Sequence, residues 1–235
     1  MYTHSYWGKP PTRIYEFIKK CDRNISVCVV GASDGKFVLP FLRKGFKVTA
    51  IDIDETAMFG GKKTIPKKRN QITALEYTKT SKKPIYTSLP TETVHIDGLI
   101  KRVQKEKLEK NFCYILGDYY RNPIEQQFDV VFTSCSIQYK SNRDIPVFEL
   151  ISTLQNNVKV NGYLYMDYMM PLEDTHDWKC EHFLRTGQIK KYFTNNNWKI
   201  CYVKEMKKPI FEAAHIDRPE DHFHRFGYIL AKRVK

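Results

Sequence analysis

Long apolar runs and closely spaced cysteine pairs are both missing from this sequence. No apolar run is long enough to cross a membrane, and the N-terminal residues contain no apolar signal core. The 6 cysteines include no pair with the spacing of a zinc knuckle, so no metal site is expected. Reduced, buried thiols are the ordinary state of such cysteines in a reducing compartment. We therefore expect a soluble, cytoplasmic protein with no membrane partner.

Acidic residues are scarce beside the basic ones. The chain has 26 Asp and Glu against 39 Lys and Arg, which gives a formal net charge of +13. This balance favours contacts with anions such as phosphates and nucleic acid. The lysines are spread along the chain, however, and only residues 62–83 form a dense basic run. With 235 residues, 42% of them hydrophobic, the chain can form one sizeable α/β domain.

One stretch near the N-terminus combines two strands, a turn and a helix. Val27–Val30 is a β-branched run typical of a strand buried on both faces. Residues 31–35 (Gly-Ala-Ser-Asp-Gly) predict a tight turn, and apolar residues at helical spacing then lead to Gly45. A second apolar run over residues 48–51 ends at Asp52. This order is half of a nucleotide-binding sheet, in which the acid accepts hydrogen bonds from ribose hydroxyls. An ordinary strand–helix–strand unit is the alternative.

The rest of the sequence alternates between predicted strands and helices. Further strands are expected at residues 112–116, 128–132, 163–167, 198–204 and 226–232. Helices are expected at residues 13–21, 94–108, 146–158 and 181–193. This alternation predicts an α/β fold with seven strands, mostly parallel, and helices on both faces. No helix separates the last two strands, so we expect them to form an antiparallel hairpin at one edge.

The segment between Asp52 and Asp118 is longer than one helix and two loops require. Residues 59–90 show no helical or strand periodicity and are rich in lysine. Stretches of this length without structure are uncommon inside a compact domain. We therefore expect a single domain over residues 1–235, with an insertion at about 59–90 that acts as a lid or lies on the surface.

A glycine turn followed by an acid suits two cofactors, a nicotinamide dinucleotide and S-adenosylmethionine. Short-chain dehydrogenases have a further glycine where this chain has Phe37, and a Tyr-x-x-x-Lys pair well downstream. One such pair here, Tyr15 and Lys19, precedes the first predicted strand. A dehydrogenase is therefore the weaker hypothesis.

Several motifs in order resemble the class I S-adenosylmethionine-dependent methyltransferases, of the type that acts on small molecules. The stretches that carry the resemblance are residues 30–35, 51–53, 116–118, 128–134 and 158–164. The expected hairpin at the C-terminus is also a trait of that family, so the resemblance extends from residue 27 to the end of the chain. It implies a Rossmann-like fold, S-adenosylmethionine as cofactor and methyl transfer as activity.

The resemblance also implies which residues bind the cofactor. Asp52 would hold the ribose, and Asp118 would meet the adenine amino group. The complete set is Gly31, Ala32, Ser33, Gly35, Asp52, Ile53, Asp118, Tyr119 and Ser134. The family often has an acid two positions before the first glycine, where this chain has Val29. Asp34 or a backbone carbonyl would then orient the methionine amino group.

Candidate catalytic residues follow from where a substrate must lie. In a parallel sheet the ligand sits beyond the carboxyl ends of the strands. Methyl transfer needs alignment and, for some acceptors, a base, and histidine accepts a proton near neutral pH. The candidates in the loops at this edge are His182, His222, His224 and Tyr139. A structural role is the alternative for each of them.

Two substrate classes remain open. We favour a small molecule or a peptide, as in specialised metabolism, because no Asn/Asp-Pro-Pro-Tyr-like motif follows the fourth predicted strand and no nucleic-acid-binding domain is appended. RNA is the alternative, because of the net charge of +13 and because residues 136–139 (Ser-Ile-Gln-Tyr) resemble a motif of cap guanine-N7 methyltransferases. A protein that binds the cofactor without catalysis is a third hypothesis, and the intact glycine turn and acids argue against it.

Overall fold

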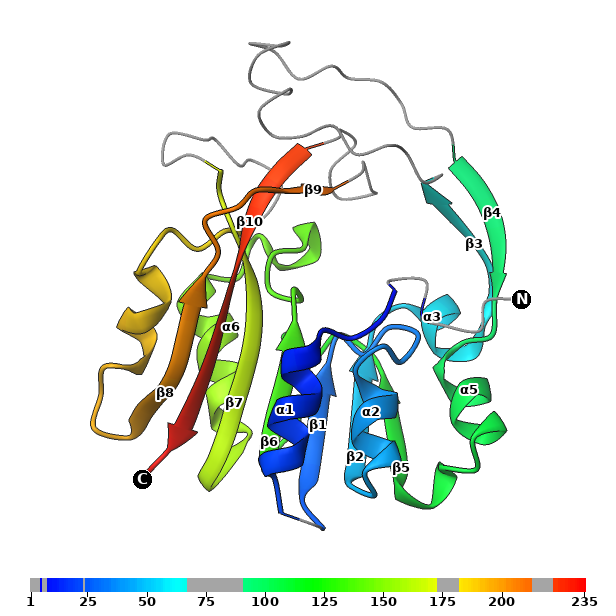
Figure 1. Cartoon of the computed structure of the whole chain (residues 1–235), viewed down its shortest axis with the longest axis horizontal. Coiled ribbons are helices and arrows are strands. Elements are labelled where there is room, and N and C mark those ends of the chain that lie inside the picture. The colour runs from blue at the N-terminus through cyan, green and yellow to red at the C-terminus, as the bar shows by residue number, and fades with distance from the viewer. Residues whose placement is uncertain (1–4, 6–7, 23, 67–90, 173–181, 213–221) are drawn as a thin grey trace.

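A single central sheet organises the chain (Figure 1). The computed structural model describes residues 5, 8–22, 24–66, 91–172, 182–212 and 222–235. In their order across the sheet, the strands are β5 (Phe112–Leu116), β2 (Lys47–Asp52), β1 (Ser26–Val30), β6 (Phe128–Ser134), β7 (Val158–Met170), β10 (His222–Arg233) and β8 (Trp198–Glu205). The short strand β9 (Ile210–Glu212) pairs with β10 outside this row.

The strand directions confirm the predicted fold class. The first five strands of the row run parallel, whereas β10 is antiparallel to both of its neighbours, β7 and β8. The sheet is therefore mostly parallel and ends in an antiparallel pair formed by the last two predicted strands. No helix among the described residues is long and apolar enough to cross a membrane.

Helices cover both faces of the sheet because its inner strands are apolar on both sides. Successive side chains of a strand point to opposite faces. Val27 and Val29 accordingly pack with one group of helices, and Cys28 and Val30 pack on the other face. The first group is α1 (Thr12–Lys20), α2 (Val38–Arg43) and α5 (Leu99–Lys105), and the other face carries α6 (Val147–Asn156). Figure 1 shows α1 and α2 in front of the sheet and α6 behind it.

The parallel strands place their following loops along one edge of the sheet. In register, Asp52 of β2 lies beside Leu116 of β5, and Ser134 of β6 lies beside Asp167 of β7. The glycine turn that follows β1 opens at this same edge. The fold therefore gathers the loops that the sequence singled out.

The helix predicted at residues 94–108 is wrong in its first part. The chain instead forms strand β4 (Thr91–Ile96) and then the shorter helix α5. β4 pairs antiparallel with β3 (Gly61–Pro66), which follows the short helix α3 (Glu55–Phe59). Gly98, with φ +74°, separates β4 from α5, and a Cβ there would lie 2.2 Å from the backbone nitrogen of Gly60. The hairpin therefore depends on two glycines that touch.

The helix predicted at residues 181–193 is also wrong as an α-helix. Its described part contains the 3-10 helix η3 (Gln188–Phe193), and residue 181 lies outside the described residues. Gly187 precedes η3 in the left-handed conformation at φ +75°, which ends any regular helix that approaches it. Of the expected insertion, residues 67–90 lie outside the described residues.

Candidate functional site

The glycine turn between β1 and α2 is tied to the end of β2. The backbone nitrogens of Gly31 and Ala32 donate to the Ile51 carbonyl at 2.9 and 3.1 Å. Gly31 has φ +72°, and a Cβ there would lie 3.1 Å from the Cβ of Ser136 in the loop after β6. The missing side chain at Gly31 therefore allows bare backbone to approach that loop closely. Gly35 is needed for packing instead, because a Cβ there would lie 2.6 Å from Leu99 of α5.

Asp52 connects the glycine turn to the residues after β2. Its Oδ2 accepts a hydrogen bond from the Ser33 backbone nitrogen at 2.6 Å, and its Oδ1 accepts one from Asp54 at 2.8 Å. Burial raises the pKa of Asp52, and these two N–H donors oppose that shift. The next residue, Ile53, is 61% exposed and offers an apolar surface beside the carboxylate.

Asp34, an acid within the turn, binds other residues of the protein. Its carboxylate accepts a hydrogen bond from Ser5 at 2.6 Å and pairs with Arg102 of α5 at 3.2 Å. Arg102 also donates to the Asp34 carbonyl. Asp34 is 3% exposed, so these contacts hold the turn against α5. The structure favours this holding role over the expected contact with a methionine amino group.

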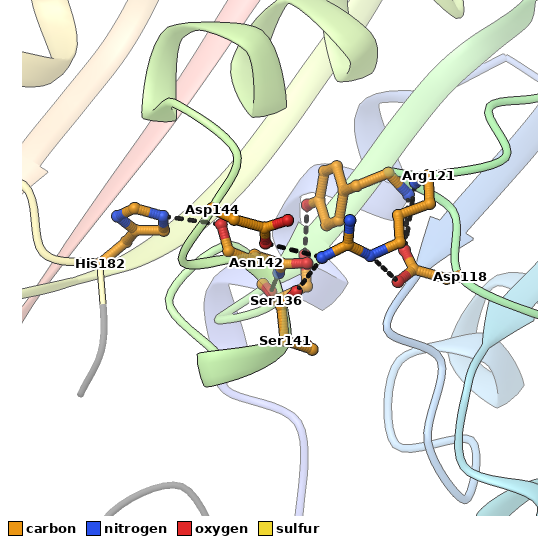
Figure 2. Close-up of polar contacts among 8 residues, drawn as sticks. Asp118, Arg121, Ser136, Ser141, Asn142, Asp144 and His182 are labelled. Atoms are coloured by element: carbon orange, nitrogen blue, oxygen red, sulfur yellow. Dashed lines mark hydrogen bonds and ion pairs between the residues drawn. The ribbon is translucent and has the colours of Figure 1, made fainter.

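Asp118 organises the loop after β5 (Figure 2). Its Oδ1 accepts from the backbone nitrogens of Tyr120 and Arg121 at 3.0 and 3.2 Å, and its Oδ2 lies 3.3 Å from Arg121 Nε. Arg121 in turn donates to the Ser141 carbonyl and to Asp144, both at 2.7 Å. Asp118 thus links the loop after β5 to the loop after β6 through one guanidinium.

Tyr119 faces the interior of the protein. It is 4% exposed, and its hydroxyl donates to the Asn157 side chain at 2.6 Å and to the Thr153 carbonyl at 3.2 Å. Burial raises the pKa of this hydroxyl strongly. The side chain of Tyr119 therefore packs against α6, and its place is in the core rather than at a ligand.

Ser134 contacts a partly buried ion pair formed with Asp167 of β7. Its hydroxyl donates to Asp167 Oδ2 at 3.1 Å, and Arg13 of α1 reaches the same oxygen at 2.7 Å. Arg13 also donates to Tyr165 at 3.0 Å and lies over the ring of Tyr228, 4.5 Å from its centroid. Burial raises the pKa of Asp167, and the guanidinium of Arg13 opposes that shift. The sequence offered no signal for Arg13, because its partners are about 150 residues or more away.

His182, one of the four catalytic candidates, contacts the loop after β6 (Figure 2). Its Nε2 lies 2.8 Å from the Asn142 carbonyl, and its backbone nitrogen donates to the Gln138 carbonyl at 2.9 Å. A carbonyl only accepts, so Nε2 carries the proton and the neutral ring keeps its lone pair at Nδ1.

The other three candidates lie in different surroundings. Tyr139 is 36% exposed in the loop after β6. His224 is 1% exposed, and its ring packs edge-on against Phe226 at 4.7 Å. His222 begins β10, but its side chain lies outside the described part of the chain. Within that part, no three His, Cys, Asp or Glu side chains gather as metal ligands would.

Comparison with known proteins gives structural matches only. The sequence matches no protein-family description and no curated protein. TehB from Haemophilus influenzae superposes with a TM-score of 0.63 at 14% identity, over 97% of this chain and 64% of TehB. Magnesium protoporphyrin IX methyltransferase ChlM from Synechocystis PCC 6803, solved with bound SAM, superposes with a TM-score of 0.55 at 13% identity. The match covers 94% of this chain and 77% of ChlM. The glycopeptide N-methyltransferase MtfA superposes with a TM-score of 0.52 at 11% identity, over 95% of both chains.

These matches identify the fold as that of the class I S-adenosylmethionine-dependent methyltransferases. The chain spans less than two thirds of the length of TehB. Identities of 11–14% establish the architecture, whereas activity depends on the particular site.

Proposed function

We propose that this chain is an S-adenosylmethionine-dependent methyltransferase that acts on a small molecule or a peptide. The observation that carries the proposal is the Asp52 carboxylate, which fixes the glycine turn at the edge where the parallel strands end. Each of its oxygens accepts one backbone N–H, and each can accept a second hydrogen bond. Two ribose hydroxyls are the partners that this geometry suits.

The surrounding residues fit the rest of the cofactor. Exposed Ile53 would pack against the flat adenine ring, and the free lone pairs of Asp118 would accept from its amino group. The proposed set is Gly31, Ala32, Ser33, Asp52, Ile53, Asp118 and Ser134, with Gly35 shaping the turn. When bound, S-adenosylmethionine supplies an already activated methyl group. The chain's own residues then need to align the acceptor and, for some acceptors, to remove a proton.

His182 is the residue that we propose as the proton acceptor. The Asn142 carbonyl fixes Nε2 as the protonated nitrogen, so Nδ1 remains basic. In His182→Gln, the side-chain amide can still donate to that carbonyl, but the base is lost. We expect this variant to keep its affinity for S-adenosylhomocysteine, by calorimetry, and to transfer radiolabelled methyl roughly 100-fold or more slowly. Equal transfer rates would exclude the role.

Isothermal titration calorimetry with S-adenosylmethionine and S-adenosylhomocysteine tests the proposal directly. We expect saturable binding of one molecule per chain. Absence of binding of either molecule at about 1 mM, the range of the weakest specific complexes, would refute the cofactor assignment. ATP serves as the control, because a site that selects the methionine side chain should not accept a triphosphate.

RNA is the second candidate substrate, and the net charge of +13 is the observation that favours it. Contacts with phosphates release counterions, so RNA affinity should fall steeply as salt rises. Filter binding of a capped and an uncapped RNA between about 50 and 300 mM salt distinguishes an RNA substrate from a small molecule or a peptide. Methyl transfer to the capped RNA alone would establish RNA as substrate, whereas no binding at 50 mM would eliminate it.

We also propose a cytoplasmic location. Among the cysteines that the structure describes, Cys21, Cys28, Cys113 and Cys201 are free thiols. Free thiols suit a reducing compartment. Quantifying reactive thiols in protein freshly extracted under alkylating conditions tests this, because oxidation there would contradict it.

A further inference from the structure

We propose that the side chain of Gln138 recognises the methyl acceptor. The acceptor would be a ring lactam, a planar amide with an N–H donor beside a carbonyl acceptor. This inference rests on the proposed methyltransferase function and names the class of substrate that the site takes. The observation behind it is a polar side chain that is enclosed by the protein and has no hydrogen bond to any residue that the structure describes.

Gln138 lies in the loop after β6 and is 1% exposed. Neither its Oε1 nor its Nε2 has a hydrogen-bond partner in the part of the chain that the structure describes. Removing an amide from water without a new partner costs free energy, so nearly all buried polar groups in proteins are paired. Because both polar atoms of the Gln138 amide lack a partner among the described residues, we infer that their partner comes from outside the chain.

The loop around Gln138 is otherwise well satisfied. The Ser136 hydroxyl lies 2.6 Å from both the Thr133 and the Tyr120 hydroxyls, and Asn142 donates to the Ser136 carbonyl at 2.9 Å. The Gln138 carbonyl itself accepts from the His182 backbone nitrogen at 2.9 Å. The backbone that carries Gln138 is therefore fixed, so a loose loop does not explain the unpaired amide.

The strand order places Gln138 on the acceptor side of the site. β2, which ends at Asp52, and β5, which precedes Asp118, lie on one side of β1, and β6 and β7 lie on the other. With the adenosine held over β2 and β5, an acceptor approaching in line with the leaving group must come from the other side, at β6 and β7. Gln138 lies in the loop that follows β6.

A second unpaired polar atom lies at the end of the neighbouring strand. Asp167 of β7 is 4% exposed, and its Oδ1 has no hydrogen-bond partner among the described residues. The Cys135 nitrogen donates to the Asp167 carbonyl at 3.1 Å, which places Asp167 next to the loop that carries Gln138. A buried carboxylate oxygen here disfavours anionic acceptors and favours groups that donate N–H or O–H.

The chemistry of the carboxamide selects the class of acceptor. Gln138 presents one acceptor oxygen and a donor nitrogen side by side. Two parallel hydrogen bonds form with a group that presents a donor and an acceptor at the same spacing, as glutamine does with nucleobase edges. A ring lactam has this edge in a rigid planar form. An ether oxygen would pair only with the amide nitrogen, and an alkyl group with neither amide atom.

The first arm of the test measures stability without any acceptor. Gln138→Met keeps the volume of the side chain and removes its polar atoms. Because the amide is unpaired, we expect the melting temperature to rise by roughly 2 to 6 °C. The control Gln126→Met makes the same change at an exposed position in the turn before β6 and should shift it by less than about 1 °C. A fall in melting temperature for Gln138→Met would show a structural role and overturn the proposal.

The second arm measures binding of a defined probe to protein saturated with S-adenosylhomocysteine. We expect 2-quinolinone to bind the wild type, 2-methoxyquinoline to bind roughly 10 to 100-fold more weakly, and Gln138→Met to lose that preference. A short guanine-containing RNA at 300 mM salt distinguishes a free lactam from a nucleobase in a polynucleotide. Binding of neither the lactam nor the RNA, or equal binding of the two quinolines, would overturn the inference.

The two proposals fail in different ways. If the wild type does not bind S-adenosylhomocysteine, the methyltransferase function itself is wrong. If it binds S-adenosylhomocysteine and Gln138→Met binds it equally, the cofactor assignment stands. The melting temperatures and the lactam probes then decide the role of Gln138 alone.

Discussion

Asp52 joins two parts of the candidate cofactor site through one carboxylate. Both of its oxygens accept backbone hydrogen bonds, from Ser33 and Asp54. In Asp52→Asn, one of these N–H groups would face another N–H donor. We expect calorimetry to show roughly 10 to 100-fold weaker binding of S-adenosylhomocysteine. Glu55→Gln, in the exposed first turn of α3, is the matched control, and unchanged affinity in Asp52→Asn would contradict the ribose role.

Arg13 illustrates a residue whose role emerges only in three dimensions. Its side chain is 32% exposed, but the side chain of its partner Asp167 is only 5% exposed, so removing the arginine leaves a buried carboxylate without its ion-pair partner. We expect Arg13→Gln to lower the free energy of unfolding by roughly 2 to 4 kcal/mol, measured by urea denaturation at pH 7. Adding Asp167→Asn should recover part of that loss. A double variant as unstable as the sum of the two single variants would show that the pair is not coupled.

At the scale of elements, the β3–β4 hairpin depends on the contact between Gly60 and Gly98. Gly98→Ala would place a Cβ 2.2 Å from the Gly60 nitrogen at φ +74°, whereas Gly45→Ala at φ +90° meets nothing within 4 Å. The second variant therefore measures the cost of the backbone conformation alone, about 1 to 2 kcal/mol. We expect Gly98→Ala to cost roughly 3 kcal/mol or more in urea unfolding. Equal losses in the two variants would show that the hairpin relaxes freely.

The elements also show where sequence reasoning succeeds. The strands β1, β2 and β6 were predictable because their buried faces require continuous apolar, β-branched runs. The stretch at residues 94–108 misled because a helix and a strand share apolar residues over short lengths. What decides there is the pairing of β4 with β3, about 30 residues away.

For the whole molecule, the sequence predicted which loops share an edge but not how their side chains pair. Glycines and acids that follow predicted strands can be recognised in the sequence, and the topology of a parallel sheet places them at one edge. The ion pairs of Arg121 with Asp118 and Asp144 join two loops. Whether the Gln138 amide finds a partner depends on the residues that surround it, and none of the described ones provides it. Such relations follow from tertiary packing, which local periodicity does not encode.

Asp129 ties three strands together at the edge of the sheet opposite the candidate site. Its carboxylate accepts from the backbone nitrogen and hydroxyl of Ser26 at 2.8 and 2.6 Å, and Lys159 lies 3.1 Å away. Burial would raise the pKa of Asp129, but these contacts outweigh it and hold the pKa below its ordinary value of 3.8. The unfolded chain therefore takes up a proton before the folded one does as the pH falls.

The stability that Asp129 contributes is thus complete above pH 3.8 and is lost as the pH falls through the lower pKa of the folded state. We expect the free energy of unfolding to drop more steeply between pH 5 and pH 3 for the wild type than for Asp129→Asn. The difference should stay within about 1 kcal/mol, because the pair with Lys159 is partly exposed. Urea titrations at both pH values measure it, and the other acids titrate alike in both proteins. Parallel pH profiles would show that the pKa of Asp129 is not lowered by folding.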